Sequence, residues 1–164
     1  LGHVIVGSGL HVDQNGVLSL ERVNFYDKGT EHVRWVASTT GTTQKEETHL
    51  FIKSVGGSGT LEEREAFFET ETLIDFSQIS FLYAEIIADA NYFNNDTSFV
   101  ILDGSNIVAT KGISSGEATN RRIINSLDVR TLSGQYKLRI HARIASSDNS
   151  QYNQAKIVSV WGER

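Results

Sequence analysis

Apolar and polar residues alternate along most of this chain, and no window carries the apolar repeat of about 3.6 residues that marks an amphipathic helix. A repeat of two places successive side chains on opposite faces of a strand. The expected strands are separated by segments rich in Gly, Asn, Asp and Ser, which form turns although the chain contains no proline. Short strands with polar turns are typical of a two-sheet sandwich or jelly roll. The pattern therefore predicts an all-β protein built as an antiparallel β-sandwich.

Two hairpins are expected at the start of the chain. In residues 3–20, "HVIV" and "GLHV" alternate, "DQNG" supplies a turn and "VLSL" resumes the alternation. A second hairpin is predicted over residues 23–37, with its turn at 27–30. Trp35 in this hairpin and Trp161 near the C-terminus both fall in strand patterns, so we expect both in the core.

The rest of the chain continues the strand pattern. Residues 38–48 are polar and aperiodic and predict an exposed loop, followed by a strand at 49–55 and a flexible segment at 56–60. Residues 61–72 are ambiguous: Thr60 and Glu63 fit a helix capping box, but a period of two continues from Phe67 and favours a strand. The remaining strands are expected at 81–89, 97–103, 106–111, 121–129, 135–145 and 155–162.

Composition narrows the functional classes. The absence of cysteine excludes a disulfide framework, a thiol nucleophile and a Cys-based zinc site. A net charge of −5 disfavours nucleic acid as a partner. The longest apolar stretches fall far short of the roughly 20 residues of a membrane-spanning helix, and no signal peptide is visible, so no membrane partner is expected. Because methionine is also absent, we expect the chain to be a processed product or a piece of a longer protein.

Two stretches resemble known proteins. "VGSGLHVDQNGVLSLE" (residues 6–21) resembles the repeat V-G-x-G-L-x-V-D-x-x-G-x-L-S, which occurs in tail fibre and baseplate proteins of bacteriophages and prophages, ahead of a C-terminal head domain. "IDFSQISFLYAEIIAD", "SFVILDG" and "SLDVRTLSGQYKLRIHARIAS" (74–89, 98–104 and 126–146) are similar to the carbohydrate-binding-module type of β-sandwich found in such heads and in secreted glycan-binding proteins.

The resemblance implies a homotrimeric receptor-binding head, located in the virion at the phage tail and acting outside the host cell. Its ligand would be a host cell-surface polysaccharide, and its upstream region would join other tail or baseplate proteins. We expect residues 1–21 to form a collar or connector hairpin and residues 22–164 the β-sandwich head.

Physical reasoning about the collar leaves two arrangements open. A unit as small as residues 3–20 cannot bury its own apolar side chains, so they pack either on the sandwich or against copies of the collar around a symmetry axis. The second arrangement favours a trimer. The apolar side chains concerned are Val4, Val6, Leu10, Val12, Leu18 and Leu20.

Catalysis has no positive support in the sequence. The five histidines form no H-E-x-x-H pattern, the serine of "VGSGL" lies between glycines but lacks the G-x-S-x-G spacing, and neither glycine cluster has the lysine of a phosphate-binding loop. Two carboxylates for glycan hydrolysis cannot be placed together from the sequence. Oxygen-rich positions at 94–96, or at Asp103 and Asn106, could hold structural calcium but lack EF-hand spacing. We therefore predict a non-enzymatic protein with no catalytic residues, cofactor or metal.

One strand carries an unusual charge pattern. In "YKLRIHARI" every second residue is cationic and the others are apolar or small, so one strand face is positive. This face could bind an anionic polymer such as a teichoic acid, pair with Glu69, Glu71 and Glu85 on neighbouring strands, or contact another subunit. The residues of this anionic-ligand alternative are Lys137, Arg139, His141 and Arg143.

Two loops are candidates for glycan binding. Segments 91–96 and 146–154 each place aromatic residues among amides and acids, and an aromatic surface beside polar groups suits the apolar faces and hydroxyls of sugars. Alternatively, Tyr92 and Phe93 cap the end of the core. The predicted glycan-binding residues are Tyr92, Phe93, Asn94, Asp96, Asp148 and Tyr152.

Three other functions remain open. A carbohydrate-binding module of a secreted bacterial enzyme would be a monomer. A purely structural tail or baseplate component would be a trimer that binds no host material. A glycan-degrading tail spike would release reducing ends from its polymer.

Overall fold

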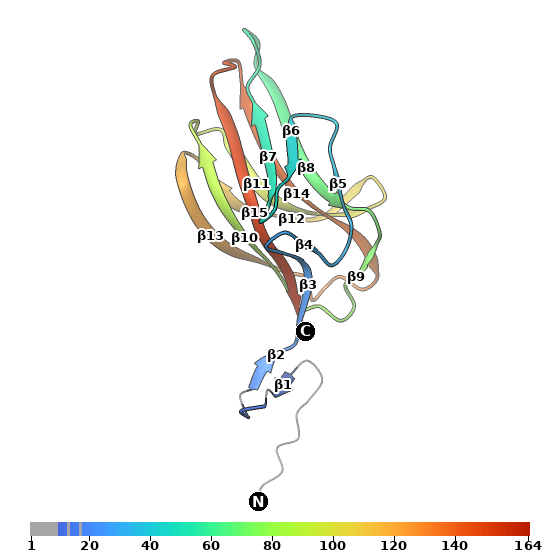
Figure 1. The fold of residues 1–164 in the computed structure, drawn as a ribbon. Helices are drawn as coiled ribbons and strands as arrows, with labels where there is room; N and C mark the ends of the chain where they lie inside the picture. The colour runs from blue at the N-terminus through green and yellow to red at the C-terminus, as the bar shows by residue number, and fades with distance from the viewer. Residues whose placement is uncertain (1–9, 13, 17) are drawn as a thin grey trace, which may run out of the picture.

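The computed structural model describes residues 10–12, 14–16 and 18–164 (Figure 1). These residues form two large antiparallel sheets, here called sheet I and sheet II, together with a small separate pair, β1 and β2. The sheets face each other as a sandwich, and the described residues contain no helix. The all-β sandwich predicted from the alternation is confirmed. The described part accordingly includes no helix with the length and apolar character to cross a membrane.

Sheet I is centred on the long C-terminal strand β15. Its order is β13–β10–β15–β3–β4, and β15 pairs with β3 through its second half and with β7 through its first half. Strand β6 lies beyond β7. The strands are β3 (Arg22–Asp27), β4 (Thr30–Glu31), β6 (Thr42–Lys45), β7 (Leu50–Val55), β10 (Phe81–Ala90), β13 (Ala118–Asp128) and β15 (Tyr152–Glu163).

Sheet II is centred on β14. Its order is β12–β11–β14–β8–β5, and the short β9 pairs with the beginning of β14. The strands are β5 (Trp35–Ala37), β8 (Glu62–Thr70), β9 (Ile74–Asp75), β11 (Asn95–Asp103), β12 (Asn106–Ser115) and β14 (Gln135–Ser146).

The core lies between the inner faces of the two sheets. Alternate residues of β10, β14 and β15 are buried there, as the period of two requires. Trp35 is 1% exposed, and its Nε1 donates to the backbone oxygen of Phe25 (3.2 Å), which satisfies the buried ring nitrogen. The core position predicted for Trp35 is confirmed. Other fully buried side chains include Phe68, Phe76, Phe99, Leu82 and Ile140.

One end of the interior is polar. Asn153 on β15 is 2% exposed, and its side-chain amide donates to the backbone oxygens of Asp96 (2.9 Å) and Arg143 (3.1 Å). Those two carbonyls belong to sheet II, so one amide of sheet I links the two layers. Buried backbone carbonyls need such partners because water cannot reach them.

Three strand predictions had different outcomes. The strand favoured over residues 61–72 is observed as β8. The exposed loop predicted at 38–48 is wrong in part, because residues 42–45 form β6 at the edge of sheet I. The second hairpin is real only as β3 and the two-residue β4, after which the chain crosses to sheet II as β5. The crossing carries the Trp35 ring into the core. Burial of this ring stabilises the folded protein by about 2 kcal/mol.

The small N-terminal pair consists of β1 (Leu10–Val12) and β2 (Leu18–Leu20), which are antiparallel. Gly16 in their connection has φ 79°, a conformation that glycine adopts without steric cost. Strand β2 leads almost directly into β3. The strand predicted over residues 3–6 lies outside the described residues.

Candidate functional site

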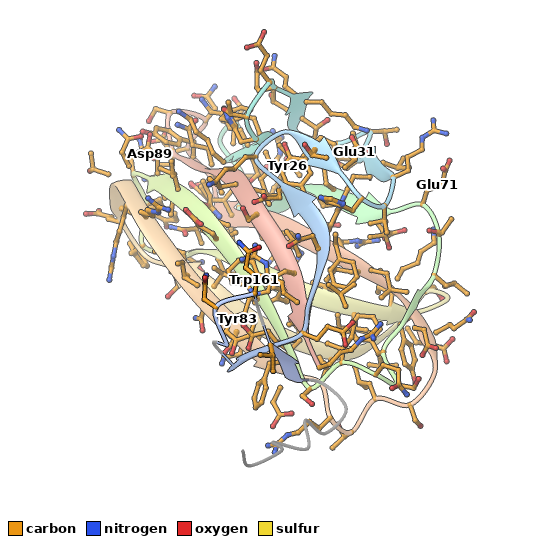
Figure 2. All side chains as sticks on the ribbon, turned by 60° about the horizontal axis from the view of Figure 1, so that its bottom comes forward. Tyr26, Glu31, Glu71, Tyr83, Asp89 and Trp161 are labelled. Atoms are coloured by element: carbon orange, nitrogen blue, oxygen red, sulfur yellow. The ribbon has the colours of Figure 1, made fainter. Side chains whose placement is uncertain are left out.

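The outer face of sheet I brings together side chains from β10 and β15. Outward-facing positions of the two strands are in register, so that Tyr83 lies opposite Trp161, Glu85 opposite Ser159, and Ile87 opposite Lys156. Figure 2 shows Tyr83 and Trp161 close together over these strands, with Asp89 toward the far end of β10. The large and polar residues at these positions form a continuous strip.

An aromatic pair occupies one end of the strip. The rings of Tyr83 and Trp161 stack with centroids 5.2 Å apart and planes 7° apart. Arg22 on β3 lies over the Trp161 ring, 4.0 Å from its centroid, on the side away from Tyr83. Trp161 is therefore only 8% exposed. The sequence pattern predicted it in the core, and it is indeed buried, but it lies on the outer face of sheet I and not in the cluster between the sheets. Among the described residues, no second ring and no cation is recorded against Tyr83.

The aromatic pair is tied to the carboxylate of Glu163. The indole Nε1 of Trp161 donates to Glu163 Oε1 at 3.4 Å. Partial burial, followed by the charge and hydrogen bond of Glu163, raises the pKa of the Tyr83 hydroxyl. Tyr83 therefore stays protonated at neutral pH, with its hydroxyl hydrogen-bonded to Glu163.

A hollow of about 460 Å³ adjoins the aromatic pair on the same face. The Glu85 carboxylate forms its floor: this side chain is only 10% exposed and forms an ion pair with Arg122 of β13. At the rim, burial and then the positive charge of Lys156 lower the pKa of His49, so its imidazole is neutral near pH 7. Lys28 also lines the hollow, so three cations surround one carboxylate.

A polar group completes the strip at its other end. Asp89 accepts hydrogen bonds from Gln154 Nε2 (2.7 Å) and from the Tyr152 hydroxyl (3.4 Å). The ammonium group of Lys53 lies over the Tyr152 ring, 4.8 Å from its centroid. Tyr152, predicted from the sequence as a loop residue, is thus the first residue of β15 and extends this face.

The two loops predicted to bind glycan lie side by side. Asn91 joins them, because its Nδ2 donates to Ser150 O (3.0 Å) and its Oδ1 accepts from Tyr152 N (2.7 Å). Tyr92 and Phe93 contact each other with centroids 4.5 Å apart, and Phe93 is 72% exposed. The loops lie at the end of the sandwich opposite the C-terminus and β1–β2 (Figure 1).

The polar members of this predicted site have local partners. Asp148 accepts from the backbone N and the hydroxyl of Ser150, so it shapes its own turn. Asn94 donates to the backbone oxygen of Ala145 (3.2 Å). Asp96 is not a loop residue: it lies in β11 and faces the cationic side chains of β14. The structure brings the two loops together but places Asp96 on sheet II.

The four cationic residues of β14 form a ladder of ion pairs on the outer face of sheet II. Lys137 and Arg139 both bind Glu69, at 3.1 and 2.8 Å, and Arg139 also covers the Phe67 ring. The predicted cross-strand pairing is observed for Glu69. It is wrong for the other two acids, because Glu71 pairs with Arg34 and Glu85 with Arg122 on sheet I.

His141 and Arg143 continue the ladder toward Asp96. The two His141 ring nitrogens lie 3.1 Å from Glu65 and 3.3 Å from Asp96, and Arg143 binds Asp96 at 2.8 Å and Glu63 at 3.1 Å. Burial opposes the charge on His141, but the hydrogen bonds to the two carboxylates outweigh it and raise the pKa. An anionic ligand would therefore have to displace carboxylates that these cations already hold.

Sequence reasoning missed the strip on sheet I. The outward residues of β10 (Phe81, Tyr83, Glu85 and Ile87) are mostly large and apolar, which is also what a strand buried on both faces looks like. The register between β10 and β15, which depends on long-range pairing, is needed to place Tyr83 beside Trp161. The described residues contain no cluster of three or more His, Asp or Glu side chains suited to a metal ion.

Comparison with known proteins adds only structural relatives. No family model matches the chain, and no curated protein matches it. A family 29 carbohydrate-binding module from Piromyces equi superposes with a TM-score of 0.52 and 8% identity, covering 87% of this chain and 89% of the module. The N-terminal cellulose-binding domain of Cellulomonas fimi β-1,4-glucanase C has a TM-score of 0.52 and 13% identity, covering 79% and 88%.

An agarase also contains a similar region, with a TM-score of 0.53 and 12% identity over 87% of this chain and 24% of the agarase. Identities this low show a common fold and nothing more. The chain shares the β-sandwich fold of carbohydrate-binding modules.

Proposed function

We propose that this protein is a non-enzymatic domain that attaches to polysaccharide through the outer face of sheet I. The observation that carries the proposal is the stacked Tyr83–Trp161 pair beside the charged hollow over Glu85. Sugars offer apolar C–H faces and outward hydroxyls, and an aromatic ring beside fixed polar groups matches both. The fold shared with carbohydrate-binding modules supports the same conclusion.

The charge of the hollow favours a polysaccharide with acidic groups. Lys28, Arg122 and Lys156 line it together with a single carboxylate, and His49 adds a neutral imidazole. A partly enclosed surface with an excess of one charge attracts ligands of the opposite charge. Unlike the cations of β14, Lys156 forms no ion pair within the described part of the chain. Binding would therefore weaken as the salt concentration rises.

At a finer level, we propose that the domain is the receptor-binding head of a bacteriophage tail fibre or baseplate protein. It would be homotrimeric, located in the virion, and would attach to the surface polysaccharide of the host cell. The glycine-punctuated motif at residues 6–21 supports this assignment. The fold is compatible with it, since β1–β2 enters at one end of the sandwich and the exposed loops lie at the other. Three weak sites per trimer would add avidity without new contacts.

A carbohydrate-binding module of a secreted enzyme is the second candidate. It is favoured by the solved structures of similar fold, which include a domain of a glucanase and a region of an agarase. This candidate predicts a monomer, whereas a phage tail head predicts a trimer. Light scattering of the purified chain separates the two. A trimer that binds no polysaccharide would instead indicate a purely structural tail component.

The binding face can be tested by affinity electrophoresis in gels that contain acidic or neutral bacterial polysaccharides. We expect retardation by an acidic polymer, with no reducing ends released from it. Lys156→Gln should weaken the retardation, while Lys137→Gln, the same change on the outer face of sheet II, should not. Loss of retardation with Lys137→Gln alone would indicate that the site lies on sheet II. The absence of retardation by every polymer would refute glycan binding.

A further inference from the structure

A second cavity lies at the edge of the sandwich, between sheet I and sheet II. It has a volume of about 450 Å³ and is bordered by β6 and β7 on one side and by β8 on the other. Strand β7 separates it from the strip described above, because Lys53 faces outward while Ser54 faces the interior. The residues that matter below are Thr40, Thr42, Lys53, Ser54, Val55 and Arg64, all of which line this edge cleft.

Ser54 is the unusual member of the edge cleft. Its neighbours on the same face of β7, Leu50 and Ile52, are apolar core residues, but Ser54 is 1% exposed and carries a hydroxyl. That hydroxyl has no hydrogen-bond partner among the described residues. Buried hydroxyl groups are nearly always paired, because an unpaired one has lost its hydrogen bonds to water without replacement. Ser54 borders the cleft, so a ligand that reaches this residue there would supply the partner that its hydroxyl lacks.

The wall of the cleft depends on a glycine. Gly41 has φ 67°, and a Cβ atom there would lie 2.5 Å from the Ala66 Cβ and 2.7 Å from the Lys53 backbone oxygen. Only glycine allows the backbone at 40–42 to approach both sheets this closely. This approach places Thr40 and Thr42 along the cleft that Ser54 also lines.

The charges around the cleft are balanced. Lys53, Glu63 and Glu65 line it, but the Lys53 ammonium lies over the Tyr152 ring and the two carboxylates bind Arg143 and His141 on the outer face of sheet II. The Arg64 guanidinium, which also borders the cleft, is held by Glu62 through its Nε (2.7 Å), so its charge is matched. The cleft therefore differs from the hollow over Glu85, where cations exceed carboxylates. None of the described residues that line it is aromatic, so recognition here would rest on hydroxyl and guanidinium hydrogen bonds and not on ring stacking.

We propose that the edge cleft is a second binding site, which takes one neutral sugar residue from a chain end or a branch. Its volume falls in the range of roughly 300–1,000 Å³ that is usual for small-ligand sites. Ser54, Thr42 and Arg64 would hydrogen-bond the sugar hydroxyls, and Val55 would contact an apolar edge of the ring. The class of ligand rests on the proposed polysaccharide binding, whereas the site itself rests on the cleft and on Ser54.

The test is a titration followed by amide chemical shifts in two-dimensional NMR. The probes are D-glucose, D-galactose, N-acetyl-D-glucosamine and D-glucuronate, each added separately to the protein. We expect saturable shifts at Gly41, Ser54 and Val55 with at least one of the three neutral sugars, and weaker shifts with glucuronate. Absence of shifts at these three amides with all four probes would overturn the proposal.

Variants then separate a sugar site from a hydrated cavity. Ser54→Ala removes the hydroxyl that has no partner, so it should fold, melt no lower than the wild type, and bind the sugar about five- to tenfold more weakly. Arg64→Gln should also weaken binding. Arg34→Gln, which breaks a matched Arg–Glu pair away from the cleft, should not. Unchanged affinity in Ser54→Ala would mean that the cleft holds only water.

The same titration distinguishes this proposal from the proposed function. Shifts confined to the strip around Tyr83 and Trp161 would support glycan binding on sheet I and refute the edge cleft. Shifts confined to the edge cleft, in a protein that no polysaccharide retards, would support the cleft and refute the proposed role of the sheet I face.

Discussion

Tyr83 and Trp161 stack across adjacent strands of sheet I, with ring planes 7° from parallel and centroids 5.2 Å apart. A pair of this kind stabilises a protein by about 0.5–1.5 kcal/mol beyond the burial of its area. Because Arg22 covers Trp161, the tryptophan supports Tyr83, and we propose that the tyrosine ring meets the ligand. The arrangement separates the residue that holds the surface together from the residue that meets a ligand.

Tyr83→Ala should therefore impair binding more than stability. We expect about tenfold weaker binding of the polysaccharide, since a stacking surface is lost, and a small decrease in Tm. Affinity electrophoresis and thermal unfolding measure the two effects. Phe93→Ala is the control, because this exposed ring contacts only Tyr92 among the ring contacts of the described residues. If Phe93→Ala weakened binding and Tyr83→Ala did not, the site would lie in the loops at 91–94 and 147–151.

Asn153→Ala should destabilise the sandwich strongly. The side-chain amide of Asn153 is buried and satisfies the backbone oxygens of Asp96 and Arg143 on the opposite sheet. Its removal leaves two buried carbonyls without these partners, at a cost of about 2–3 kcal/mol in the free energy of unfolding. Urea denaturation measures the change. Asn125→Ala, which removes an exposed hydrogen bond to Gly112, should cost less than about 1 kcal/mol, and equal losses would contradict the role of Asn153.

The His141 cluster should make stability depend on pH in two directions. Burial would raise the pKa of Asp96, but hydrogen bonds from His141, Ser98 and Arg143 outweigh it and lower the pKa from 3.8. The hydrogen bond from His141 likewise lowers the pKa of Glu65. These carboxylates stabilise the fold above their ordinary pKa values and cease to do so as the pH falls. The raised pKa of His141 has the opposite effect: its contribution is complete below 6.5 and is lost as the pH rises through the higher pKa of the folded state.

The cluster therefore contributes most between the ordinary pKa values of glutamate and histidine, 4.5 and 6.5. In His141→Gln, the loss of unfolding free energy on moving from this window to a pH well above 6.5 should be smaller than in the wild type. Urea midpoints at the two pH values give the comparison. The two proteins differ only at residue 141, so a difference between their pH profiles reports His141. Identical pH profiles would exclude His141 as the titrating group.

Deleting residues 1–20 should lower the oligomeric state if these residues assemble a trimer. Light scattering of the full chain and of the truncated chain is the measurement, and the thermal unfolding of the sandwich is the control for folding. We expect a trimer to become a monomer with little change in Tm. A trimer that survives the deletion would locate the subunit contacts on the sandwich, and a monomeric full chain would favour the enzyme-module alternative.

Local pattern was enough to predict most strands. In β14, the alternation of cationic with apolar or small residues matches one outer and one inner face. In β8, the period of two outweighed a capping box because Phe68 and Ala66 are required in the core. The pattern failed where it was weak: β6 has a polar sequence and is a strand only because β7 offers it backbone hydrogen bonds.

The candidate site was much harder to predict from the sequence than the strands were. Tyr152, which was predicted to bind glycan, lies on the strip, whereas Asp96 belongs to the ion pairs of sheet II. Glu85 illustrates the limit, because its partner could be any arginine until β13 is known to lie beside β10. Likewise, nothing in the segment "LFIKSV" indicates that Ser54 borders a cleft formed with β8.

The sequence by itself determined that the chain forms strands, which side chains share a strand face, and that two faces must meet to bury the apolar set. These properties follow from the two-residue period and from the hydrophobic effect, both of which act on neighbouring residues. Only the tertiary structure decided which strands lie side by side, and thus which aromatic ring stacks on Trp161 and which carboxylates hold His141. Those contacts arise from pairing between distant segments, and many pairings satisfy the same local pattern equally well.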